Sequence, residues 1–77
     1  MNAKKIKICG INDINILQNI INLKIDYVGF IFYEKSPRYV DEKFLKTLNK
    51  INFKKIRPVC VYVNPDEDFV YKTSSYF

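Results

Sequence analysis

The spacing of hydrophobic positions changes several times along the chain, and each change marks a different kind of element. Residues 6–9 (IKIC) have the length and composition of a short strand, and residues 27–33 (YVGFIFY) and 57–63 (RPVCVYV) are longer apolar runs. Such runs are typical of strands in a parallel sheet that is covered on both faces. Between them, in residues 11–23 and 41–51, apolar side chains recur at helical spacing. This order predicts an α/β fold with parallel strands and right-handed crossovers.

Polar residues before the helical segments predict where each helix begins. Asn12 and Asp41 are the expected N-caps of the first two helices. For a third helix of only one or two turns, we expect Asn64 as the cap and Pro65 at the first helical position. Residues 72–77 (KTSSYF) show no helical periodicity, and we predict an irregular tail there.

The predicted sheet is too small to be covered by its own helices. The chain has 77 residues, which allows one small domain with a thin core. A sheet of three parallel strands has two open edges, and strands that are apolar on both faces need cover on both. We therefore expect the chain to be a piece of a larger domain, or to pair with another chain.

Composition argues against several classes of protein. The sequence has two cysteines and no histidine, so it lacks a Cys/His zinc pattern, and we expect Cys9 and Cys60, which lie in apolar runs, to be free, buried thiols. The longest apolar run is far below the ~20 residues of a membrane span, and the N-terminus has no signal-peptide core. The net charge is +5, but the basic residues are scattered. We expect a cytoplasmic protein that binds neither nucleic acid nor membrane.

Three places in the predicted fold carry candidate chemistry, because functional groups in an α/β sheet gather where strands end. These places are Cys9 with Gly10, the loop 33–39 with Arg38, and Asn64. A thiolate can act as a base or nucleophile, and a guanidinium can bind a carboxylate or phosphate through two hydrogen bonds. From the residues alone, simpler interpretations are preferred: a packing cysteine, a surface arginine near the acids of the next helix, and a helix cap.

Three segments taken together resemble a known family. They are KICGI at 7–11, DYVGFIFYEKSPRYV at 26–40 and VCVYVN at 59–64, and they are similar to phosphoribosylanthranilate isomerase of tryptophan biosynthesis. The resemblance runs nearly from end to end of the chain. It implies a partial TIM (β/α)8 barrel, in which residues 1–77 form an N-terminal fragment of about the first three βα units, with the active site at the carboxyl ends of the strands.

The resemblance also implies a reaction and two site residues. The family converts N-(5-phosphoribosyl)anthranilate to 1-(2-carboxyphenylamino)-1-deoxyribulose 5-phosphate, an Amadori rearrangement that uses no metal or organic cofactor. Cys9 matches the general base of the family, and Arg38 matches the arginine that contacts the anthranilate end. The resemblance thus reverses the simpler interpretations of both residues.

Other parts of the family's site have no counterpart in these residues. The general acid of the family is an aspartate on a later strand, and its phosphate is held by the last loops of the barrel. We therefore expect the 77-residue chain to be inactive alone. The expected partners are a phosphorylated small-molecule substrate in the full-length family and a complementary barrel half. The alternative is a non-catalytic α/β module that docks to a partner chain through its open sheet edge.

Overall fold

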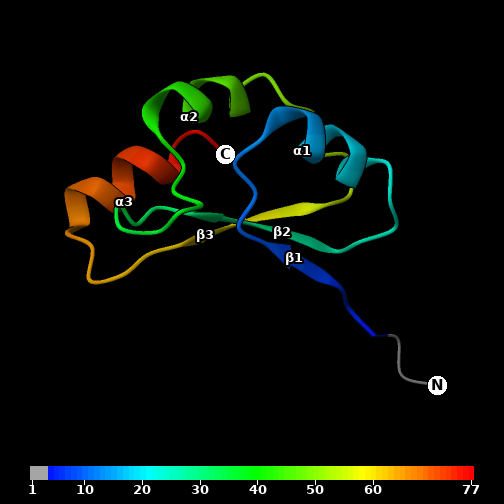
Figure 1. The fold of residues 1–77 in the computed structure, drawn as a ribbon, viewed down its shortest axis with the longest axis horizontal. Helices are drawn as coiled ribbons and strands as arrows, with labels where there is room; N and C mark the ends of the chain where they lie inside the picture. Colours follow the sequence, from blue (N-terminus) through cyan, green and yellow to red (C-terminus); the bar gives the residue numbers. More distant parts are fainter. Residues whose placement is uncertain (1–3) are drawn as a thin grey trace.

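The computed structural model describes residues 4–77, and its strands and helices alternate as predicted (Figure 1). In chain order the elements are β1 (Lys7–Cys9), α1 (Ile14–Ile21), β2 (Tyr27–Ile31), α2 (Glu42–Leu48), β3 (Arg57–Val61) and α3 (Glu67–Ser74). The strands form one parallel sheet in the order β1-β2-β3. The predicted α/β fold with parallel strands is confirmed.

The register of the sheet decides which side chains share a face. Cys9 on β1 lies opposite Gly29 on β2, and Gly29 lies opposite Val59 on β3. Paired residues of a parallel sheet point to the same face, and successive residues of a strand point to opposite faces. Cys9, Gly29 and Val59 therefore occupy one face, while Phe30 and Cys60 occupy the other.

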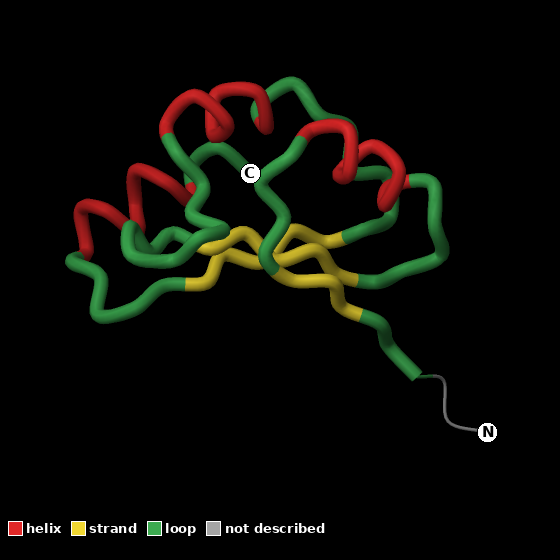
Figure 2. The backbone as a smooth tube through the Cα atoms, in the orientation of Figure 1, coloured by secondary structure: helices red, strands yellow, loops and turns green. Residues whose placement is uncertain are grey.

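All three helices lie on one side of the sheet, and the hydrophobic core lies between them and β2 (Figure 2). Phe30 is completely buried there, and its ring centroid lies 6.2, 6.0 and 5.4 Å from those of Phe44, Phe53 and Phe77. Residues from each of the first two helices complete this core: Leu17 and Ile20 from α1, Leu45 and Leu48 from α2.

The opposite face of the sheet carries no helix within residues 4–77 (Figure 2). Lys7 and Cys9 are exposed on this open face, and Ile31, Val59 and Val61 are half-buried. The apolar runs predicted strands with cover on both faces, and the described residues provide cover for only one.

Two of the three predicted helix caps are wrong. Asp41 caps α2 as expected, but Asp13 rather than Asn12 caps α1, and Asp66 rather than Asn64 caps α3. An N-cap residue has an extended backbone and lies directly before the first helical turn, so that its side chain reaches the free N–H groups. Asn64 instead has a φ of +45°, in the left-handed region, and α3 begins later than Pro65 suggested.

The predicted irregular tail is helical over residues 72–74. The third helix is as short as expected, but it continues to Ser74 because tertiary contacts hold its last turn. Thr73 is buried, and its Oγ1 lies 2.6 Å from the hydroxyl of Tyr62 on the chain that follows β3. Phe77 is 40% exposed, and its ring stacks on that of Phe30. Neither contact is visible in the periodicity of the local sequence.

The stability of the fold should depend strongly on the aromatic cluster around Phe30. We expect Phe30→Ala to lower the free energy of unfolding by about 3–5 kcal/mol, because it leaves a cavity at the centre of the core. The control Tyr71→Ala removes an aromatic side chain that is 81% exposed, so the free energy should stay within about 0.5 kcal/mol. Urea denaturation followed by circular dichroism measures both variants, and equal midpoints would contradict this account of the core.

The two cysteines are free and lie on opposite faces of the sheet, so they cannot form a disulfide with one another in this fold. Cys9 is exposed on the open face. Cys60 faces the helices, where burial raises the pKa of its thiol and a hydrogen bond with Tyr62 offsets part of that rise. A higher pKa leaves less of the reactive thiolate at a given pH. The free thiols expected from the sequence are confirmed, but the expectation that both are buried is wrong for Cys9, because the face on which it lies carries no helix within residues 4–77.

Alkylation with iodoacetamide should therefore modify Cys9 faster than Cys60 at neutral pH. The rate at Cys60 should continue to rise at alkaline pH, because its raised pKa delays formation of the thiolate. Peptide mass spectrometry of a time course measures each site separately. In concentrated urea, where the chain is unfolded, the difference should nearly vanish. Equal rates in the native chain would show that Cys60 is not shielded.

Candidate functional site

A sharp turn after β1 leaves the Cys9 thiol at the end of the strand. Gly10 has a φ of +83°, a left-handed conformation that glycine adopts without a steric cost. The N–H groups of Gly10 and Ile11 both donate hydrogen bonds to the Gly29 carbonyl, at 3.0 and 3.3 Å. This turn ends the strand at Cys9, so that its thiol lies at the carboxyl edge of the open face.

The loop after β2 folds back over the end of its own strand. The Ser36 N–H donates to the Tyr33 carbonyl at 2.9 Å, and the Ser36 hydroxyl accepts a hydrogen bond from the Arg38 N–H at 3.1 Å. The Val40 N–H then donates to the Ile31 carbonyl at 2.8 Å, which returns the chain to β2. Serine side chains commonly stabilise turns in this way. These hydrogen bonds hold the backbone of the loop in place at Arg38, and so they determine the point from which its side chain extends.

The structure brings two of the sequence-predicted places together. The side chain of Arg38 lies over Gly10: a β-carbon at residue 10 would be 2.7 Å from Cδ of Arg38 and 3.1 Å from its Nη1. The guanidinium therefore lies directly beside the residue that follows Cys9. The only ion pair within residues 4–77 joins Lys72 to Glu42 at 3.8 Å, so Arg38 does not pair with the acids of α2.

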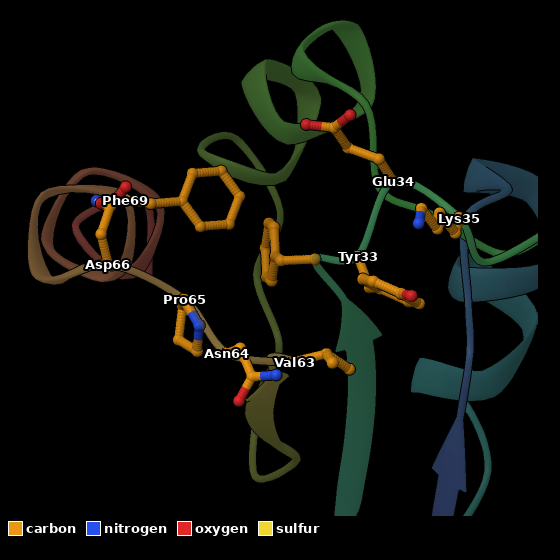
Figure 3. A pocket seen from close by; sticks show the side chains of 9 residues that line it. Tyr33, Glu34, Lys35, Val63, Asn64, Pro65, Asp66 and Phe69 are labelled. Atoms are coloured by element: carbon orange, nitrogen blue, oxygen red, sulfur yellow. The ribbon is translucent and has the colours of Figure 1, made fainter.

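The third predicted place, Asn64, lines a cavity of about 360 Å³ together with the first residues of the loop 33–39. The cavity is formed where β2 and β3 end, and side chains of both following segments and of α3 surround it (Figure 3). Its wall includes Tyr33, Glu34, Lys35, Val63, Asn64, Pro65 and Asp66. Glu34 and Lys35 belong to the loop 33–39, which the sequence indicated as a candidate place because it follows a strand, although neither residue was named there as a site residue.

The arrangement of Cys9 and Arg38 suits acid–base chemistry on an anionic ligand. A thiolate can accept a proton, and a guanidinium binds a carboxylate through two parallel hydrogen bonds. Among the described residues, no group of three or more His, Cys, Asp or Glu side chains is placed to hold a metal ion. The helices of residues 4–77 include none with the length and apolar character needed to cross a membrane.

Comparison with known proteins identifies a single family. The family model described as N-(5'-phosphoribosyl)anthranilate (PRA) isomerase matches residues 6–76. The N-(5'-phosphoribosyl)anthranilate isomerase of Staphylococcus aureus (strain Mu3) is 42% identical over 62 residues, which are 80% of this chain and 30% of that protein. The enzyme of the same name from Agrobacterium fabrum is 35% identical over 65 residues, covering 84% of this chain and 30% of its own length.

Solved structures of the same family share the fold. Monomers of the dimeric phosphoribosylanthranilate isomerase from Thermotoga maritima match with a TM-score of 0.81 and 29% identity, over 96% of this chain and 37% of that one. A phosphoribosylanthranilate isomerase in complex with reduced 1-(o-carboxyphenylamino)-1-deoxyribulose 5-phosphate matches with a TM-score of 0.76 and 28% identity, over 96% of this chain and 38% of that one. The partial (β/α)8 barrel expected from the sequence is confirmed.

The extent of these matches also defines what the chain contains. It spans about 30% of the length of the curated relatives that it matches. The family model matches all of the 77 residues except 1–5 and 77. The chain belongs to the N-(5'-phosphoribosyl)anthranilate isomerase family.

Proposed function

We propose that this chain forms the first three βα units of an N-(5'-phosphoribosyl)anthranilate isomerase of tryptophan biosynthesis. The observation that carries the proposal is the position of Arg38 over Gly10, the residue that follows Cys9, where β1 and β2 end. A proton acceptor and a carboxylate-binding group are thereby adjacent at the edge of the sheet where barrel enzymes of this architecture bind their substrates.

In this proposal Cys9 is the general base of the Amadori rearrangement. The furanose ring opens as a general acid protonates its oxygen, which leaves a Schiff base at C1′. Cys9 then removes the proton from C2′, and the resulting enol tautomerises to the ketone. An exposed thiol at the end of β1 is accessible to a substrate that lies across the carboxyl edge of the sheet.

Arg38 binds the carboxylate of the anthranilate ring. A guanidinium presents two parallel N–H donors that match the two oxygens of a carboxylate. The ligand of the related complex, reduced 1-(o-carboxyphenylamino)-1-deoxyribulose 5-phosphate, carries both a phenyl carboxylate and a phosphate. Arg38 lies free of ion pairs with the acids of α2, so its donors are available for such a ligand.

Turnover needs more than these two residues. The family resemblance assigns the general acid and the phosphate-binding loops to later strands, which a complementary chain or further residues would supply. Such a partner would also cover the open face of the sheet, where Ile31, Val59 and Val61 are half-buried. The 77 residues alone should be inactive, since one general acid or base contributes ~10²–10⁴-fold to the rate. The cytoplasmic location stays a prediction.

A chimeric enzyme provides the direct test of this function. Residues 6–76 replace the matching segment of the Staphylococcus aureus relative, and isomerisation is followed by the loss of substrate fluorescence. We expect the chimera to turn over substrate, and Cys9→Ala in the chimera to lower kcat by about 10²–10⁴-fold, because the base is lost.

The chimera also offers a matched control for the cysteine. Cys60→Ala removes the other thiol, which faces the helices, and kcat should stay within a few-fold of the parent. A folded chimera without isomerase activity would overturn the proposed function. Full activity in Cys9→Ala would overturn the role of the thiol as the base.

Substitution of Arg38 should affect substrate binding more than chemistry. In the chimera, Arg38→Ala should raise KM by about 10–100-fold, because a charge-assisted hydrogen-bonded contact is worth about 1.5–3 kcal/mol. Arg38→Lys should restore part of the loss, since it keeps the charge but not the paired donors. Lys43→Ala, on the exposed surface of α2, is the charge-matched control and should leave KM unchanged. An unchanged KM in Arg38→Ala would exclude the carboxylate contact.

A further inference from the structure

We propose that Gly29, in the middle of β2, is a positioning residue for Cys9: the side chain that it lacks leaves the space in which the Cys9 thiol lies. The inference rests on the proposed function for its catalytic consequence. Its structural basis is independent of that function, because it concerns only contacts within β1 and β2.

The space above Gly29 is already occupied by side chains of β1. Gly29 is buried and lies opposite Cys9 in the sheet. A β-carbon on residue 29 would lie 2.7 Å from Sγ of Cys9, 3.2 Å from its Cα and 3.2 Å from Cε of Lys7. Non-bonded carbon and sulfur atoms do not approach to 2.7 Å without strong repulsion. Any other residue at position 29 must therefore displace the thiol.

The requirement for glycine at this position is one of space and not of backbone conformation. Among the described glycines only Gly10 has a positive φ, so the backbone of Gly29 is one that other residues adopt readily. Glycine in the interior of a strand is unfavourable compared with alanine, because it loses more conformational freedom on folding. Because glycine occurs in this central strand despite its unfavourable conformational entropy, we infer that the space left by its missing side chain is needed there.

The two glycines of the sequence have matching roles in this arrangement. Gly10 lies beneath the Arg38 side chain, and Gly29 lies beneath the Cys9 thiol. Each of the two proposed site side chains thus rests on a residue that has no side chain. The Cys9 thiol can therefore lie over β2, toward the centre of the open face, where a substrate held by Arg38 would extend.

A methyl group on residue 29 would prevent the Cys9 thiol from occupying this position. The thiol would have to rotate to another staggered rotamer, about 120° away, which moves Sγ by about 3 Å. A general base must lie within about 2.6–3.2 Å of the group whose proton it removes, so such a shift is enough to separate the base from C2′. Binding of the anthranilate carboxylate by Arg38 would not change.

A double-mutant cycle on the 77-residue chain tests the contact without any activity. We expect Gly29→Ala to lower the urea midpoint, and Cys9→Ala/Gly29→Ala to recover at least half of that loss relative to Cys9→Ala alone, because the obstructing sulfur is gone. Additive midpoints would overturn the proposal. If Gly29→Ala does not fold, folding of the double variant supports the proposal, and failure of both to fold overturns it.

Kinetics of the chimeric enzyme test the positioning role itself. Gly29→Ala should lower kcat at least tenfold and leave KM within about threefold, whereas a general structural defect would alter both. The matched control Val59→Ala, in the same row of the sheet on the other side of Gly29, should keep kcat within about threefold. Unchanged kcat in a folded Gly29→Ala chimera would overturn the role. An inactive parent chimera would overturn only the proposed function, since the urea cycle still tests the contact.

Discussion

The structure depends on the alternation of side chains along β2, the strand that pairs with both of its neighbours. Two consecutive residues of this strand, Gly29 and Phe30, have different structural roles on its two faces. Phe30 points toward the helices and fills the centre of the core, where three other rings surround it. Gly29 points the other way and leaves room for the Cys9 thiol. Because successive residues of a strand cannot share a face, the same register that buries Phe30 also places the thiol.

The buried core and the proposed site residues therefore lie on different faces of one sheet. The helix side holds the buried hydrophobic residues, including the fully buried Leu17 and Leu48, and it also holds Cys60, where burial raises the pKa of the thiol. The open side holds Cys9 at its carboxyl edge, and the Arg38 side chain lies over Gly10, the residue that follows Cys9.

The open face relates the three strands within residues 4–77 to the longer proteins of the family. The chain matches about 30% of the length of the curated relatives, and within that part its fold follows that of the Thermotoga maritima enzyme. In a (β/α)8 barrel this face is the packed interior, which further strands close. The half-buried Val59 and Val61 are apolar positions that such strands would cover. The proposed base, Cys9, and the proposed carboxylate-binding residue, Arg38, both lie in the segment that precedes those further strands.

Much of this protein is determined by its sequence alone. Local patterns were sufficient for the order of strands and helices and for the Asp41 cap, because periodicity and capping act over a few residues. The motifs around Cys9 and Arg38 were sufficient to select both residues as candidates. Only the tertiary structure decided that Asn64 lines a cavity instead of capping a helix, and that residues 72–74 are helical. It also decided that the two glycines lie beneath the side chains of Arg38 and Cys9, the proposed site residues, since these outcomes depend on contacts between residues far apart in the chain.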